Sequence, residues 1–124
     1  MTMILVTPPA SEPVSLAEAK AFLRLDNSDD DTLIDTLIAT ARVALELRTG
    51  RYFVTQGWRY VRDAWPSSRL VSLPASPLQS VDAVTVYDDD GDPAVLPATG
   101  YIVDTASVPP RLKLRSSALA DPGQ

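Results

Sequence analysis

The sequence contains no cysteine and no histidine among its 124 residues. Without cysteine there is no disulfide framework, no thiolate nucleophile and no thiolate-bound zinc. Without histidine, the side chain that most often carries protons near neutral pH and most often binds metals is missing as well. Most familiar catalytic arrangements are therefore excluded.

Long hydrophobic runs and an excess of positive charge are also absent. The N-terminal apolar run, residues 3–6, ends at Thr7-Pro8-Pro9 with no basic residue before it, which is too short for a signal peptide or a membrane span. We therefore expect no membrane partner. The net charge of −5 disfavours sequence-independent DNA binding by the surface as a whole. The composition is that of an ordinary globular protein, and we expect a single domain over residues 1–124.

Two helices are predicted near the N-terminus. Ser15 and Glu18 form a capping box before an apolar periodicity, which places a helix at about 15–25. Ser28 is the predicted cap of a second helix that ends at Gly50. We expect the two helices to pack as a pair over residues 13–50, to form the stability core and to take part in a subunit contact. The residues assigned to this helix packing are Phe22, Leu33, Ile34, Leu37, Ile38, Ala41 and Leu45.

After Gly50 the hydrophobic period changes from about 3.6 residues to 2, which is typical of strands. Proline and glycine separate the strands that this pattern predicts, at 58–62, 70–73, 80–87, 94–96, 101–104 and 111–114. The β region, residues 51–115, is therefore expected to form a small antiparallel β-sheet or sandwich. The fold class is α+β, with an N-terminal pair of packed helices before the sheet. We expect residues 116–124 to form a flexible tail.

Two runs of aspartate are candidate metal sites. Asp88, Asp90 and Asp92 alternate, but an EF-hand loop that starts at Asp88 needs glycine and glutamate where this sequence has Pro93 and Thr99. A solvated hairpin turn explains the aspartates and the glycine of residues 88–92 equally well. The run at 29–31 fits the first turn of a helix, where the dipole favours negative charge. We expect no metal, and a metal-assisted hydrolase is the least favoured function.

Charge is segregated along the chain. Residues 51–69 hold four arginines against Asp63 alone, whereas residues 79–104 hold six aspartates and no basic residue. Solvated surface explains this pattern, and so does head-to-tail self-association or a basic edge that faces DNA. The candidate residues of a subunit interface or DNA channel are Arg51, Arg59, Arg62, Arg69, Asp88, Asp90, Arg111, Lys113 and Arg115.

The ordered series of motifs resembles the head–tail connector (adaptor) proteins of tailed bacteriophages and of phage-derived gene transfer agents. The likeness runs from about residue 4 to residue 115. In the helical part it is carried by Pro13–Lys20, Phe22–Asp26, Asp29–Asp31, Leu33-Ile34, Ala41-Arg42 and Thr49–Arg51. In the β region it is carried by Thr55-Gln56, Trp58-Arg59, Leu73-Pro74, Pro77–Val81, Tyr87, Asp90-Gly91, Tyr101 and Val103-Asp104.

The resemblance implies a structural role in the neck of a virion that is assembled in the bacterial host cytoplasm. Members form a ring, commonly of twelve subunits, under the portal protein and link the capsid to a tail or stopper protein, while DNA passes through. They have no enzymatic activity and no cofactor. Members usually continue beyond the strand at 111–114 with portal-contacting helices, so we expect this chain alone to be a monomer or weak oligomer. The alternative is a nucleic-acid-binding protein with an Arg-rich β face.

Overall fold

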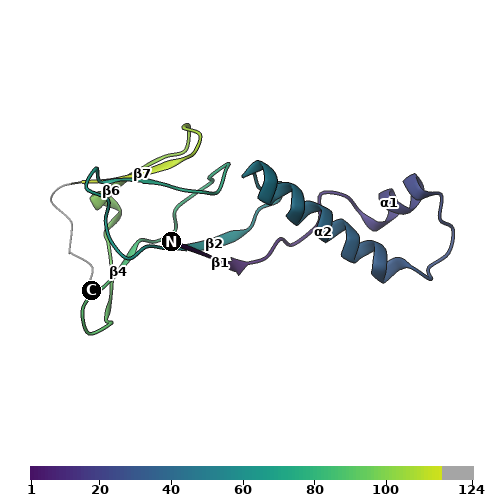
Figure 1. Cartoon of the computed structure of the whole chain (residues 1–124), viewed down its shortest axis with the longest axis horizontal. Coiled ribbons are helices and arrows are strands. Elements are labelled where there is room, and N and C mark those ends of the chain that lie inside the picture. The colour runs from purple at the N-terminus through teal and green to yellow at the C-terminus, as the bar shows by residue number, and fades with distance from the viewer. Residues whose placement is uncertain (116–124) are drawn as a thin grey trace. The chain divides into compact units, whose positions relative to one another are not determined.

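The computed structural model describes residues 1–115 of the chain (Figure 1). The chain divides into two compact units, one formed by Leu5–Trp58 and the other by Met1–Ile4 together with the residues from Arg59 onward. Two helices precede several small sheets, so the predicted α+β fold class is confirmed. In the part that the structure describes, neither helix is long and apolar enough to cross a membrane. The tail predicted at 116–124 lies outside the described residues.

Helix α1 spans Leu16–Leu23 and begins as the sequence predicts. The Ser15 hydroxyl accepts a hydrogen bond from the backbone N–H of Glu18 at 3.1 Å, and the Ser15 N–H donates to Glu18 Oε2 at 3.0 Å, which completes the capping box. The helix ends at Arg24, whose φ of 57° is left-handed. None of its side chains is fully buried, and a helix of eight residues is marginal alone, so α1 depends on its contact with α2.

Helix α2 spans Asp31–Thr49 and starts later than predicted. The residue before it, Asp30, makes no side-chain capping bond, so the predicted cap at Ser28 is wrong. Asn27 Oδ1 instead accepts the backbone N–H of Asp29 at 3.2 Å in the turn before the helix. The predicted end at Gly50 is confirmed, with a φ of 65° that glycine adopts without strain.

Strands β1 (Thr2–Thr7) and β2 (Gly57–Val61) form a two-stranded sheet, and the sequence analysis missed β1. A Cβ atom at Gly57 would lie 3.1 Å from the side chain of Thr7. Glycine therefore allows the two strands to approach closely at this point.

The other strands form two antiparallel sheets. Strands β3 (Leu70–Ser72), β7 (Arg111–Leu114) and β6 (Tyr101–Asp104) form one sheet in the order β3-β7-β6, in which Leu112 lies between Val71 and Val103. Strands β4 (Thr85–Tyr87) and β5 (Pro93–Val95) form a hairpin. The strand predicted at 80–87 therefore forms only over its last three residues. A short 3-10 helix, η1 (Ala98–Gly100), precedes β6.

The buried hydrophobic core lies in the sheets. Val71, Val86, Leu96, Leu112 and Leu114 form one buried cluster, whereas Ile34 is the only apolar side chain of α2 that is buried. The prediction that the helical pair forms the stability core is therefore wrong. Most of the apolar residues of the helices are exposed within this chain.

Candidate subunit interface

The face of α2 that packs within its own unit is largely polar. Lys20 Nζ of α1 lies 2.7 Å from Asp31 Oδ1 at the start of α2, and Arg42 Nε donates to Glu12 Oε2 at 2.6 Å. Ion pairs, in addition to a few apolar contacts, therefore hold α1 and the segment before it against α2. The buried and half-buried positions of this face recur every three or four residues and include Asp31, Ile34, Ile38, Arg42 and Glu46.

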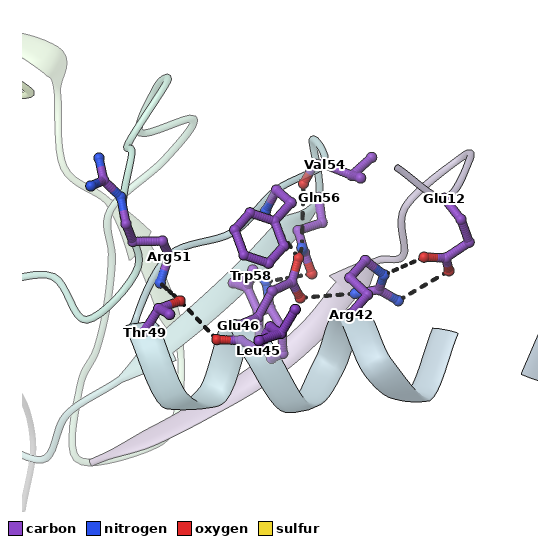
Figure 2. Close-up of polar contacts among 10 residues, drawn as sticks. Glu12, Arg42, Leu45, Glu46, Thr49, Arg51, Val54, Gln56 and Trp58 are labelled. Atoms are coloured by element: carbon purple, nitrogen blue, oxygen red, sulfur yellow. Dashed lines mark hydrogen bonds and ion pairs between the residues drawn. The ribbon is translucent and has the colours of Figure 1, made fainter. Parts of the chain in front are cut away.

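Glu46 is the centre of a hydrogen-bond network that Figure 2 shows, and its side chain is only 4% exposed. Oε2 accepts from Arg42 Nη1 at 2.8 Å, and Oε1 accepts from the Phe53 backbone N–H and from Gln56 Nε2, both at 3.1 Å. Gln56 in turn accepts from Trp58 Nε1 at 3.2 Å. The carboxylate thereby joins the C-terminal half of α2 to the segment that leads into β2, and both of its oxygens are satisfied.

Arg42 lies between two carboxylates, and its side chain is 9% exposed. The hydrogen bonds to Glu12 are the largest cause of its raised pKa, with desolvation acting in the opposite direction and Glu46 adding to the increase. Burial, followed by the charge of Glu46, raises the pKa of Tyr52, whose ring lies 5.5 Å from that of Trp58. Removing one member of a buried ion pair costs about 3–5 kcal/mol, so the network fixes this part of the fold.

The opposite face of α2 is apolar and exposed. Leu37 is 56% exposed and Leu47 is 79% exposed. The hydroxyls of Thr36 and Thr40 donate to the carbonyls four residues earlier, at 2.9 and 2.8 Å, so these polar groups are already satisfied within the helix. We call the face from Leu33 to Leu47 the outward stripe; at 1.5 Å per residue it is about 21 Å long. A hollow on the stripe is lined by Thr36, Ala39, Thr40, Val43, Ala44 and Leu47.

The helix residues predicted to pack together lie on different faces. Ile34 is buried and Ile38 is half-buried, as predicted for a packed stripe. The others are exposed within this chain, Phe22 most of all at 87%. The expectation of one buried apolar stripe is therefore wrong for Phe22, Leu33, Leu37, Ala41 and Leu45. A surface helix normally turns its apolar side inward, so α2 is inverted with respect to its own chain.

The predicted basic residues come from several elements. Arg59 is exposed, whereas Arg62 is half-buried and its Nη1 lies 3.3 Å from the hydroxyl of Tyr60, in keeping with the alternation of side chains along β2. Arg69 has a left-handed φ of 57° immediately before β3. Arg51 follows α2, Arg111 and Lys113 lie on β7, and Arg115 follows that strand.

Asp88 closes the turn of the β4–β5 hairpin. Its Oδ1 accepts the backbone N–H groups of Asp90 and Asp92 at 3.0 and 2.8 Å, and its carbonyl accepts the N–H of Gly91 at 3.0 Å. The predicted hairpin turn is therefore confirmed. Among residues 1–115, no group of three or more His, Cys, Asp or Glu side chains could hold a metal ion.

Asp104, for which no site role was predicted, organises the loop between β6 and β7. Its Oδ2 accepts from Ser107 Oγ at 2.6 Å and from Arg111 Nη2 at 2.8 Å, while Oδ1 accepts two backbone N–H groups. The Ser107 hydroxyl, and next the Arg111 guanidinium, hold the pKa of Asp104 well below its usual range. Arg111 is thus already paired within the chain.

No site role was predicted for Glu12, Glu46 or Gln56 either. One signal was available, because Arg42 and Glu46 have the four-residue spacing of a helical ion pair. Nothing in that spacing indicates that the pair is buried. Glu12 lies thirty residues before its partner, and no local pattern links them.

The comparison with protein families covers the helical pair and the first part of the β region. Residues 13–91 match the model of the family described as "Phage gp6-like head-tail connector protein". The chain belongs to this head–tail connector family. The family consists of structural connectors, not enzymes. No curated protein matches the chain.

Two solved structures contain chains similar to this connector. One is a chain in the neck of an empty gene transfer agent particle computed with C6 symmetry; it matches 100% of this connector with a TM-score of 0.83 and 25% identity. The other is a chain in the virion of a native gene transfer agent particle; it matches 99% of this connector with a TM-score of 0.81 and 25% identity. The connector spans 66% of the length of each of these chains.

The family match includes some of the surfaces described above and excludes others. The outward stripe of α2 and the start of the β4–β5 turn lie inside residues 13–91 of the connector, whereas β6 and β7 lie outside them. The exposed apolar helix face is therefore part of the region by which the chain belongs to the family.

Proposed function

We propose that this connector is a structural protein of the neck of a phage or gene transfer agent particle. In this proposal, copies of the chain form a ring, with twelve subunits as the family suggests, between the portal protein and a tail or stopper protein, and DNA passes through the ring. The observation that carries the proposal is the inversion of α2, which buries Arg42 and Glu46 and exposes the outward stripe.

Because the outward stripe of α2 is apolar and exposed, a second copy of the chain is the partner that we expect to cover it. Single exposed leucines are common on protein surfaces, but a continuous apolar surface marks an interaction site. Burying an apolar side chain contributes about 1.5–3 kcal/mol, so a few residues such as Leu37 and Leu47 supply much of what a subunit contact needs. The chain to which this connector is similar lies in a neck computed with C6 symmetry, which supports assembly into a ring.

The contact in such a ring is heterologous, because one surface of each subunit meets a different surface of the next and the rotation closes. The outward stripe is then one of two surfaces that each subunit supplies. The charged residues predicted for the interface or for the DNA channel, such as Arg51 and Arg59, belong to this proposal as well. Both are exposed.

The proposal is tested with two variants at one position, Leu47→Glu and Leu47→Met. Leu47 is 79% exposed, so neither change should alter the fold. Sedimentation velocity would follow the association of each variant with itself and with the portal protein of the same particle. We expect Leu47→Glu to abolish assembly and Leu47→Met to preserve it, because methionine keeps the surface apolar. Equal assembly of both variants would contradict the role of the stripe.

A further inference from the structure

The outer face of the β3-β7-β6 sheet is a second uncovered surface. On the inner face, Leu112 and Leu114 enter the buried cluster. On the outer face, Lys113 lies between Leu70 of β3 and Ile102 of β6, which are its partners in the sheet. A hollow of about 480 Å³ on this face is lined by Ser68, Leu70, Ile102, Asp104, Arg111 and Lys113.

Among the charged residues that line this hollow, Lys113 differs in forming no ion pair within the described residues. Arg111 is paired with Asp104, while Lys113 is exposed and has no ion pair within residues 1–115. The two aliphatic neighbours of Lys113 frame its side chain on both sides. A lysine in such a position covers apolar surface with its stem and presents its ammonium group to a ligand. The hollow therefore suits a carboxylate that is carried next to an apolar or aromatic group.

The β4–β5 hairpin has this combination. Its turn is held by Asp88, whose Oδ1 is occupied by two backbone N–H groups. Asp90 and Asp92 are exposed and form no ion pair in the described part of the chain. Tyr87, which directly precedes the turn, is more than half exposed. The hairpin thus presents two free carboxylates beside an aromatic ring, on a turn whose backbone is already ordered.

We propose that the Asp88–Asp92 turn of one copy docks into the outer hollow of the next copy. Lys113 there pairs with the carboxylate of Asp90 or Asp92, and Tyr87 covers the aliphatic side chains beside Lys113. This contact rests on the proposed ring, and it names the second pair of surfaces by which neighbouring subunits meet. It is heterologous, as a ring requires, because hairpin and hollow are different surfaces of the same chain.

Both surfaces are complementary in charge, which favours this occupant. Residues 79–100, which include the hairpin, hold five aspartates and no basic residue, whereas the hollow holds Lys113 in addition to the paired Asp104 and Arg111. Exposed pairs of this kind set association rate and salt sensitivity more than they set buried energy. The docking should therefore weaken as the ionic strength rises and the Debye length shortens.

The absence of cysteine allows a direct test by cross-linking. Chains with Pro93→Cys, beside Asp92 in the hairpin, and differently tagged chains with Ser68→Cys, in the lining of the hollow, would be mixed and oxidised under assembly conditions, so that Lys113, Asp90 and Asp92 are all retained. A matched control replaces Pro93→Cys with Asp82→Cys, which lies on the same acidic segment outside the turn. Because docking raises the effective concentration of the two thiols, we expect the mixed disulfide to form at least about tenfold faster than in the control. Equal rates would overturn the docking.

Charge reversal separates this proposal from the ring itself. We expect Lys113→Glu to weaken assembly and the further change Asp90→Lys in the same chain to restore it in part. If Leu47→Glu abolishes assembly while Lys113→Glu leaves it unchanged, the ring stands and the hairpin docking is refuted. If Lys113→Glu weakens only the binding of a short DNA duplex, the hollow serves DNA phosphates and the docking is likewise refuted. If the unaltered chain does not assemble even on its portal, the proposed ring fails as well.

Discussion

Replacing Glu46 by alanine should strongly destabilise the unit of this connector that Leu5–Trp58 form. The substitution removes the ion pair with Arg42 at 2.8 Å and the acceptor for two further donors, the Phe53 N–H and Gln56 Nε2, both at 3.1 Å. Arg42 retains Glu12 as a partner, and its guanidinium stays almost fully buried. Losing one partner of a buried pair costs about 3–5 kcal/mol. The remaining bond to Glu12 places the expected loss near the lower end of that range.

The isosteric variant Glu46→Gln separates the contribution of the carboxylate charge to stability from that of the side chain's size and packing. If the amide oxygen accepts from Phe53 and Gln56, the amide NH2 group faces the Arg42 guanidinium, and because both groups are donors the hydrogen bond to Arg42 is lost. A hydrogen bond to a charged group contributes about 1.5–3 kcal/mol, so Glu46→Gln should cost roughly half as much as Glu46→Ala. A third variant, Asp35→Asn, changes an exposed aspartate of α2 and serves as the control for a loss of surface charge.

The assay is urea unfolding at neutral pH, followed by circular dichroism of the helices and by tryptophan fluorescence. Trp58 hydrogen-bonds to Gln56 of the network, and Trp65 is the second tryptophan, so fluorescence is followed in a Trp65→Phe background to assign the signal to Trp58. The midpoint should fall for Glu46→Ala while the slope with denaturant stays the same, because the unfolded state is unchanged. A loss below about 1 kcal/mol for Glu46→Ala would refute the argument, since it would mean that water replaces the carboxylate without cost.

Three further predictions concern other parts of the molecule. In the monomer, Ile34→Ala should lower the free energy of unfolding by about 2–5 kcal/mol because Ile34 is buried, whereas Leu37→Ala should lower it by about 1 kcal/mol because Leu37 is half exposed. Chemical unfolding of both variants measures the difference, and equal losses would contradict the prediction. Ser15→Ala should cost about 1 kcal/mol and reduce helical circular dichroism, because the capping box is lost; Ser15→Asp should restore most of the signal. The hydrogen bonds that lower the pKa of Asp104 stabilise the fold fully above the ordinary carboxyl pKa of 3.8, and this stabilisation is lost as the pH falls below 3.8. The difference in melting temperature between the natural chain and Asp104→Asn should therefore be constant from pH 7 to 5 and should shrink below about pH 4.

Local signals predicted the parts of the fold that local interactions determine. The capping box at Ser15 and the helix end at Gly50 depend on residues within a few positions, and both are confirmed. The predicted cap at Ser28 was wrong because several short polar residues follow one another here, and the sequence does not tell which of them binds the backbone. In the structure it is Asn27 that accepts a backbone hydrogen bond in this turn. Strand β1 was missed because its apolar residues were weighed only as a targeting or membrane segment.

The orientation of α2 could not be predicted from its periodicity. Apolar residues at three- and four-residue spacing predict an amphipathic helix, but they do not tell whether the same chain or another covers the apolar side. What decides the orientation is the set of ion pairs on the other face, above all the pairing of Arg42 with Glu12 and Glu46. The bond to Glu12 joins residues far apart in the sequence, and only the folded structure brings them together.

The central claim of this account is that a second copy of the chain covers the outward stripe of α2. The most direct measurement is the rate at which a maleimide labels a single cysteine placed there by Val43→Cys, with Asp35→Cys, outside the stripe on the same helix, as the control. We predict that assembly slows the labelling of Val43→Cys by at least about tenfold, as burial in an interface requires, while labelling of Asp35→Cys changes little. Labelling of Val43→Cys at the same rate in the free chain and in the assembled ring would contradict the claim.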